Sequence, residues 1–231
     1  MNTKNQIATT NLPVSERERK HARISTEIAA QGIVLLENRD CLPFDENVKT
    51  IALFGNGARR TIKGGTGSGD VNVRSFVSVE QGLQRSGFKI VTSAWLDEYD
   101  SLITKARAVY FDNIREATRQ GALAGLLAMM SNPFHAPEFR CLTENELNQY
   151  PADLAVYVLA RNSGEGADRE LAPGDYYLNS QEIHDITLLS QQYDKFVLLL
   201  NTGGVIDLSP VRNLPGLGAI VLIGQGGSGT G

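Results

Sequence analysis

The sequence predicts an α/β fold, a three-layer α/β/α sandwich with a mostly parallel sheet. Four short apolar runs show no polar alternation, which is typical of strands buried on both faces. These runs lie at residues 51–54, 154–159, 196–200 and 219–223, and residues 88–91 form a weaker fifth. Helical patterns separate most of the runs, and strands that alternate with helices imply parallel crossovers with helices on both faces.

The first expected element is a helix that begins at Ser15. Ser15 and Glu18, three residues later, form a capping-box pattern. The inward face of this helix is expected to carry Ala22, Ile24, Ile28 and Leu35. Residues 38–44 are the loop that ends it.

Further helical patterns lie at residues 79–86, 95–130 and 180–193, and Asn179 with Glu182 opens the last. Residues 122–130 are the most apolar segment, but they are too short to span a bilayer. We expect them to be the packed end of the helix at residues 95–130. Proline-rich residues 131–150 are expected to be an irregular and mobile insertion.

Length and charge limit the possible organisation and partners. A chain of 231 residues fits one domain, and we expect it to cover residues 14–231 after a flexible arm at residues 1–13. A formal net charge of −4 offers no basic patch for nucleic acid. No apolar run is long enough for a membrane helix, and the start of the chain does not resemble a signal peptide.

The cysteines and histidines predict neither a disulfide framework nor a metal site. Cys41 and Cys141 are far apart and are expected to be reduced, which fits the cytoplasm. The three histidines have no cysteine or carboxylate at metal-ligand spacing. We therefore expect no metal and no cofactor.

Glycine-rich segments follow two of the predicted strands. Residues 63–70 could cradle a phosphate, but they lack the Gly-Lys-Ser/Thr ending of a P-loop. Residues 224–229 match GxGxxG after a strand, yet the helix and acidic residue of a dinucleotide site do not follow within the sequence. A nucleotide-binding domain is thus an alternative with little support.

Glu165 stands between two glycines directly after the run at residues 154–159. Open α/β sheets place their chemistry outside the carboxyl ends of the strands, and flanking glycines let the backbone aim a side chain into a cleft. The same loop contains Asp168 and Arg169. It is therefore either a catalytic loop or a solvated polar turn, and no GxSxG motif supports a serine hydrolase.

Several segments together resemble the α/β sandwich domain of glycoside hydrolase family 3, the β-glucosidase and β-xylosidase family. They occur in the family's order and cover nearly the whole chain. The matching segments are residues 28–38 with Leu42 and Pro43, then 50–55, 63–70, 163–169 and 224–227.

The resemblance implies a retaining glycosidase that acts on β-linked glycosides. In the family, a (β/α)8 barrel supplies an aspartate nucleophile and the sandwich supplies the general acid/base, a position that matches Glu165. Ser68 would approach the sugar, and Lys63, Asp70, Asp168 and Arg169 would support the loops. We read Arg169 as a partner of Asp168 or Glu170.

The order of domains is a further expectation from the resemblance. A sandwich that begins near Met1 resembles the subgroup in which the barrel follows it, so we expect this chain to be a fragment that is inactive alone. The alternative outside catalysis is an α/β module that binds sugar or another partner.

Overall fold

The structure is a computed structural model that describes residues 13–65, 73–132, 134–162 and 169–231. Its centre is a six-stranded sheet in the order β1-β6-β5-β4-β2-β3, in which β2 to β6 are parallel and β1 lies antiparallel to β6. The strands are β1 (Val34–Asn38), β2 (Thr50–Phe54), β3 (Lys89–Ile90), β4 (Leu154–Arg161), β5 (Phe196–Thr202) and β6 (Leu217–Leu222).

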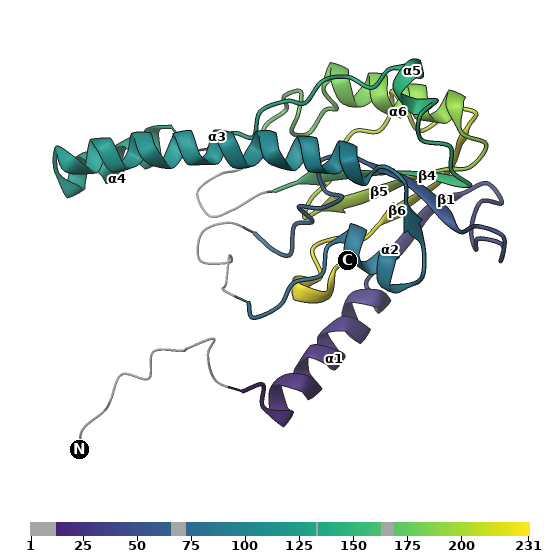
Figure 1. The fold of residues 1–231 in the computed structure, drawn as a ribbon, viewed down its shortest axis with the longest axis horizontal. Coiled ribbons are helices and arrows are strands. Elements are labelled where there is room, and N and C mark those ends of the chain that lie inside the picture. The colour runs from purple at the N-terminus through teal and green to yellow at the C-terminus, as the bar shows by residue number, and fades with distance from the viewer. Residues whose placement is uncertain (1–12, 66–72, 133, 163–168) are drawn as a thin grey trace.

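Helices cover the sheet from both sides and make the predicted three-layer sandwich. In Figure 1, α5 and α6 lie above the sheet and α1 and α2 lie below it. The helices are α1 (Glu16–Gln31), α2 (Val79–Arg85), α3 (Ser93–Arg119), α4 (Ala122–Ser131), α5 (Glu144–Leu147) and α6 (Ser180–Gln192), with a 3-10 turn, η2, at Gly227–Gly229. No described helix has the length and apolarity needed to cross a membrane.

Capping boxes fix where three of the helices begin. Ser15, Ser78 and Asn179 each accept a hydrogen bond from the third residue of their helix, and that residue's side chain bonds back to the cap. Each box satisfies two backbone donors that a helix start would otherwise leave unpaired. The predicted starts at Ser15 and Asn179 are confirmed.

The core lies on both faces of the central strands. All eight residues of β4 are buried, and Ile51, Leu53, Phe196 and Leu198 of the neighbouring strands have no exposed surface. Phe54 of β2 and Trp95 of α3 make a T-shaped contact with ring centroids 5.1 Å apart, which packs α3 against the sheet. The continuous apolar runs therefore form the buried strands that the sequence predicts.

The first helix ends earlier than the sequence indicated. Gly32 caps α1, and Val34 then pairs with Leu222, so Leu35 belongs to the edge strand β1 and not to a helix. Ile24 and Ile28 are 38% and 63% exposed, and α1 has no buried residue. The expectation of an inward face was wrong because α1 lies mainly against the short η2 turn and not against the sheet.

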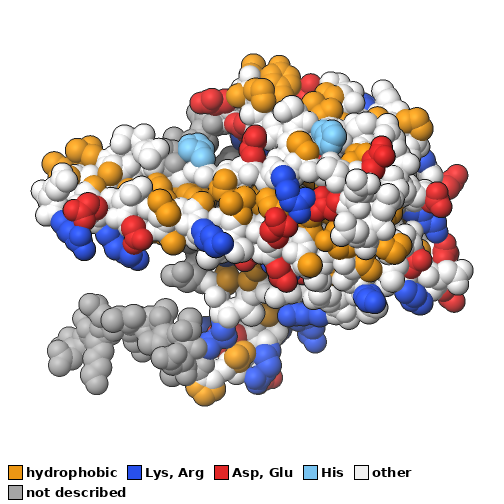
Figure 2. Space-filling model, turned by 45° about the horizontal axis from the view of Figure 1, so that its top comes forward, with side chains coloured by type: hydrophobic (Ala, Val, Ile, Leu, Met, Phe, Trp, Pro, Cys, Tyr) orange, Lys and Arg blue, Asp and Glu red, His pale blue; other side chains and the backbone are white. Residues whose placement is uncertain are grey.

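The second long helical pattern is two helices joined at Gly121, whose φ of +139° suits only glycine. α4 folds back on α3, and the pair projects beyond the rest of the molecule (Figure 1). Leu123, Leu126 and Met130 are exposed, and Figure 2 shows hydrophobic side chains along this hairpin. The expectation that residues 122–130 are packed was wrong, because the hairpin extends past the sheet that could bury them.

We expect Leu198→Ala to lower the free energy of unfolding by about 2–5 kcal/mol, because it leaves a cavity in the centre of the sheet. Urea unfolding followed by circular dichroism measures the change. Leu171→Ala is the matched control, since Leu171 is 76% exposed. Equal effects of the two substitutions would contradict the burial described here.

Candidate active site at the carboxyl ends of the strands

The topology singles out one edge of the sheet. The chain leaves β2 towards β3 on one side, and later leaves β4 towards β5 on the other, while β2 and β4 are neighbours. The loops after β2 and β4 thus diverge at their carboxyl ends. Open α/β sheets bind ligands in the crevice at such a switch point.

Asn56 joins the loop after β2 to β4. Its Nδ2 donates to the carbonyl of Ala160 at 3.1 Å, and its Oδ1 accepts the Ala160 N–H at 2.7 Å. Gly55, with φ +93°, approaches so closely that a Cβ there would lie 2.4 Å from the Val158 carbonyl oxygen. The loop after β2 is therefore held against β4 by the side-chain amide of Asn56 and by a close backbone approach that requires glycine at position 55.

Asn201, the fully buried residue near the end of β5, holds the segment that contains Lys63. Its Oδ1 accepts the Ile62 N–H at 2.5 Å, and its Nδ2 donates to the carbonyls of Ile62 at 2.9 Å and Gly224 at 2.6 Å. The Lys63 carbonyl accepts the Gly227 N–H at 2.9 Å. Lys63 thus takes part, through its backbone, in a junction between the loops after β2 and β6.

Two arginines stand at the ends of the loop after β4. Arg161 is 6% exposed and pairs with Glu182 at 2.5 Å, while its Nε donates to the Asp175 carbonyl at 3.1 Å. Arg169 binds the carboxylate and, at 2.8 Å, the carbonyl of the same Asp175. Among the described residues its carboxylate partner is Asp175, whereas we expected Asp168 or Glu170.

Four of the predicted site residues, Ser68, Asp70, Glu165 and Asp168, lie outside the described residues. The described residues 61–65, which precede Ser68 and Asp70, and residues 161 and 169, which flank Glu165 and Asp168, meet the same edge of the sheet. Sequence reasoning missed Asn56, Asn201 and Asp175. A polar residue at the end of an apolar run was the available signal for Asn201, but nothing local distinguished Asp175.

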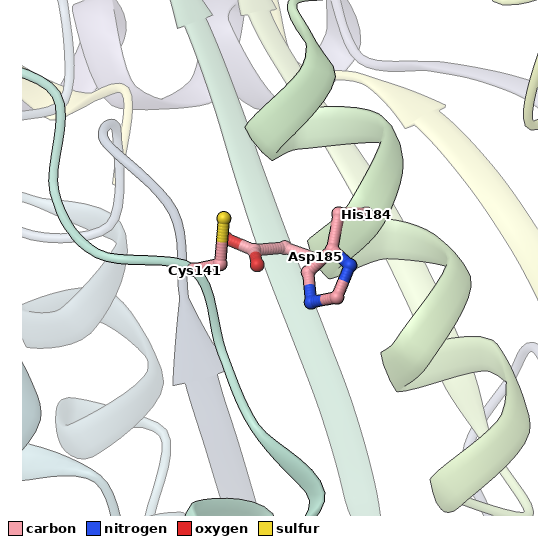
Figure 3. A group of neighbouring side chains, drawn as sticks. All are labelled: Cys141, His184 and Asp185. Carbon is pink, nitrogen blue, oxygen red and sulfur yellow. The ribbon is translucent and has the colours of Figure 1, made fainter.

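A second cluster brings together Cys141, His184 and Asp185 (Figure 3). Their potential ligand atoms lie within 4.8 Å of one another, so the group could hold a metal ion such as Zn²⁺. His184 Nε2 already lies 2.9 Å from the Leu142 carbonyl, and Asp185 Oδ1 accepts the Leu142 N–H at 2.8 Å. The side chains of His184 and Asp185 therefore both hydrogen-bond to the backbone of Leu142. The sequence did not show the group because Cys141 lies more than forty positions away.

The model of the glycosyl hydrolase family 3 C-terminal domain matches residues 33–231. This chain belongs to glycosyl hydrolase family 3. It matches the α/β domain of that family, and the relatives and solved structures that it resembles are β-glucosidases.

Relatives of this family 3 domain are much longer proteins. β-Glucosidase A of Butyrivibrio fibrisolvens is 28% identical over 95% of this chain, which spans 28% of that relative's length. β-Glucosidase 3B of Thermotoga neapolitana, solved in complex with glycerol, is 33% identical with a TM-score of 0.70 over 92% of this chain and 28% of that one. A β-glucosidase of Paenibacillus barengoltzii, 24% identical with a TM-score of 0.71 over 95% of this chain and 22% of that one, shares the fold.

The buried carboxyl of Asp185 predicts a pH dependence of the stability of this family 3 domain. Burial raises the pKa of Asp185 from 3.8 to about 6, although the Leu142 N–H and His184 lower it in part. Because the folded state holds the proton more tightly than the unfolded chain, ionisation of Asp185 lowers the free energy of unfolding as the pH rises from about 4 to 6.

We expect Asp185→Asn to gain stability relative to the parent chain between pH 4 and 7, by up to about 3 kcal/mol, since asparagine keeps an acceptor for Leu142 without a charge. Urea unfolding at several pH values measures this difference. Asp207→Asn is the control. We expect it to lose stability relative to the parent chain as Asp207 ionises, because hydrogen bonds from Ser209 lower the pKa of Asp207. A stability difference for Asp185→Asn that does not vary with pH would contradict the assignment.

Proposed function

We propose that this chain is the sandwich domain of a retaining β-glycosidase that hydrolyses terminal β-linked sugars, with Glu165 as its general acid/base. The observation that carries the proposal is family membership with relatives named β-glucosidases. The place of Glu165 in the sequence supports the proposal further, because Glu165 follows β4, and β4 ends beside the switch point at the carboxyl edge of the sheet.

The second half of the site would come from a (β/α)8 barrel. In a retaining mechanism, Glu165 gives its proton to the glycosidic oxygen while a barrel aspartate bonds to the anomeric carbon and the glycosidic bond breaks. Glu165, now a carboxylate, then takes a proton from water. The water oxygen bonds to the anomeric carbon, and the bond to the aspartate breaks. Ser68 would contact the sugar.

Two carboxyl groups in a retaining enzyme lie about 5–5.5 Å apart, so they can come from different domains. The described residues fix the edge of the sheet from which the loop with Glu165 begins. Asn56 fixes the loop after β2 to β4, and Asn201 joins the loops after β2 and β6. Positional precision of this kind is what a general acid requires.

A chimera tests the role of Glu165. This chain would replace the matching 28% of B. fibrisolvens β-glucosidase A, and hydrolysis of methyl β-glucoside and 4-nitrophenyl β-glucoside would be measured. We expect Glu165→Gln to lower kcat/KM for the methyl glucoside by roughly 10²- to 10⁴-fold. The aryl glucoside should lose less, because its leaving group needs little protonation.

Glu170→Gln is the matched control, since Glu170 is an exposed carboxylate five residues further on. It should leave both rates within about twofold of the parent chimera. A Glu165→Gln chimera that hydrolyses both substrates like the parent would remove Glu165 from the role. The isolated chain serves as the blank, because a general acid without a nucleophile does not support covalent catalysis.

A further inference from the structure

Asp175 connects both ends of the loop that follows β4. Its carbonyl accepts hydrogen bonds from Arg161 Nε at 3.1 Å and from Arg169 Nη2 at 2.8 Å. Its carboxylate binds Arg169 Nε through one oxygen and accepts the Glu170 N–H at 2.6 Å through the other. One residue thus ties together the positions on either side of residues 162–168.

The turn that carries Asp175 is itself held in place. The Tyr176 N–H donates to the Glu170 carbonyl at 3.2 Å, and the Gly174 N–H donates to the Tyr177 carbonyl at 2.9 Å. The Asp207 N–H donates to the Tyr176 carbonyl at 2.9 Å, which attaches the turn to the segment after β5. Asp175 is therefore a fixed point and not a mobile surface carboxylate.

Arg161 links this fixed point to the core. Its Nη2 lies 2.5 Å from Glu182 Oε2, and both side chains are less than one-tenth exposed. The same Glu182 oxygen accepts the Asn179 N–H at 2.9 Å as part of the capping box that starts α6. A continuous set of charged hydrogen bonds runs from the start of α6 through the end of β4 to Asp175 and Arg169.

We propose that Asp175 is a positioning residue for the general acid/base, because it closes the base of the Glu165 loop by binding Arg169 while its backbone binds Arg161. The inference rests on the proposed function, since it assigns the role through Glu165. A displacement of about 1 Å in a reacting group can cost roughly 100-fold in rate. Without the Asp175 carboxylate, the largely buried Arg169 guanidinium loses its ion-pair partner among the described residues and keeps its hydrogen bond to the Asp175 carbonyl, so the end of the loop is held less firmly.

The first test uses the chain itself. The tryptic cleavage site Arg169–Glu170 includes both groups that the Asp175 carboxylate holds. We expect Asp175→Asn to speed tryptic cleavage at this bond by about tenfold or more, because local opening exposes it more often. Mass spectrometry identifies the fragment. Asp207→Asn is the matched control, since the Asp207 carboxylate accepts a hydrogen bond from the Ser209 N–H and, among the described residues, has no hydrogen bond to Arg169 or Glu170.

The second test uses the chimera with the two glucosides. A variant that merely folds less well loses the same fraction of rate on both substrates, because only the amount of active protein changes. A misplaced acid loses more rate on the substrate with the poorer leaving group. We therefore expect Asp175→Asn to lower kcat for methyl β-glucoside at least tenfold more than for 4-nitrophenyl β-glucoside, with Asp207→Asn unchanged.

Glu165→Gln in the same assay separates the two proposals. Leaving-group selectivity in both Glu165→Gln and Asp175→Asn, together with faster cleavage at Arg169, supports the positioning role. Selectivity in Glu165→Gln with an equal loss on both substrates in Asp175→Asn overturns the positioning role alone. A Glu165→Gln chimera without selectivity overturns the proposed function and, with it, the role of Asp175. Unchanged tryptic cleavage in Asp175→Asn contradicts the closed base directly.

Discussion

The parallel pairing of β2, β4 and β5 is the constraint on which the rest of the structure depends. All eight residues of β4 are buried, so each backbone N–H and C=O within it needs a partner in a neighbouring strand. Parallel pairing meets this need and also brings the carboxyl ends of the three strands to one edge. Because consecutive parallel strands require crossovers, the helices are placed on the faces, and the loops are left to build a site.

That edge is organised by polar side chains that bond to backbone. Asn56 bonds to β4, and Asn201 of β5 bonds to both Ile62 and Gly224, so the loops after β2 and β6 are fixed to each other and to the central strands. The Arg161–Glu182 pair adds a buried charge interaction between β4 and α6. Removing one partner of such a pair is costly, because the other is left as an uncompensated buried charge.

The capping boxes, the apolar runs and the order of the elements could be predicted because each depends on residues close together in sequence. The Ser15 and Asn179 caps and the strands from β2 to β6 follow from such patterns. The strand β1 could not be predicted in this way, because it is a strand only through its pairing with β6, almost two hundred residues later. The burial of α4 was predicted wrongly for a related reason, since apolar composition does not show whether a neighbouring layer reaches it.

The sequence by itself determined the α/β class, the positions of the buried strands and the likeness to family 3, because alternation of apolar runs and helical patterns is local information. Only the tertiary structure decided that Arg169 binds Asp175, that Asn201 joins two loops, and that Cys141 meets His184. These contacts depend on which chain segments the sheet order brings together. A side chain's partner is set by that arrangement in space, and spacing along the chain does not record it.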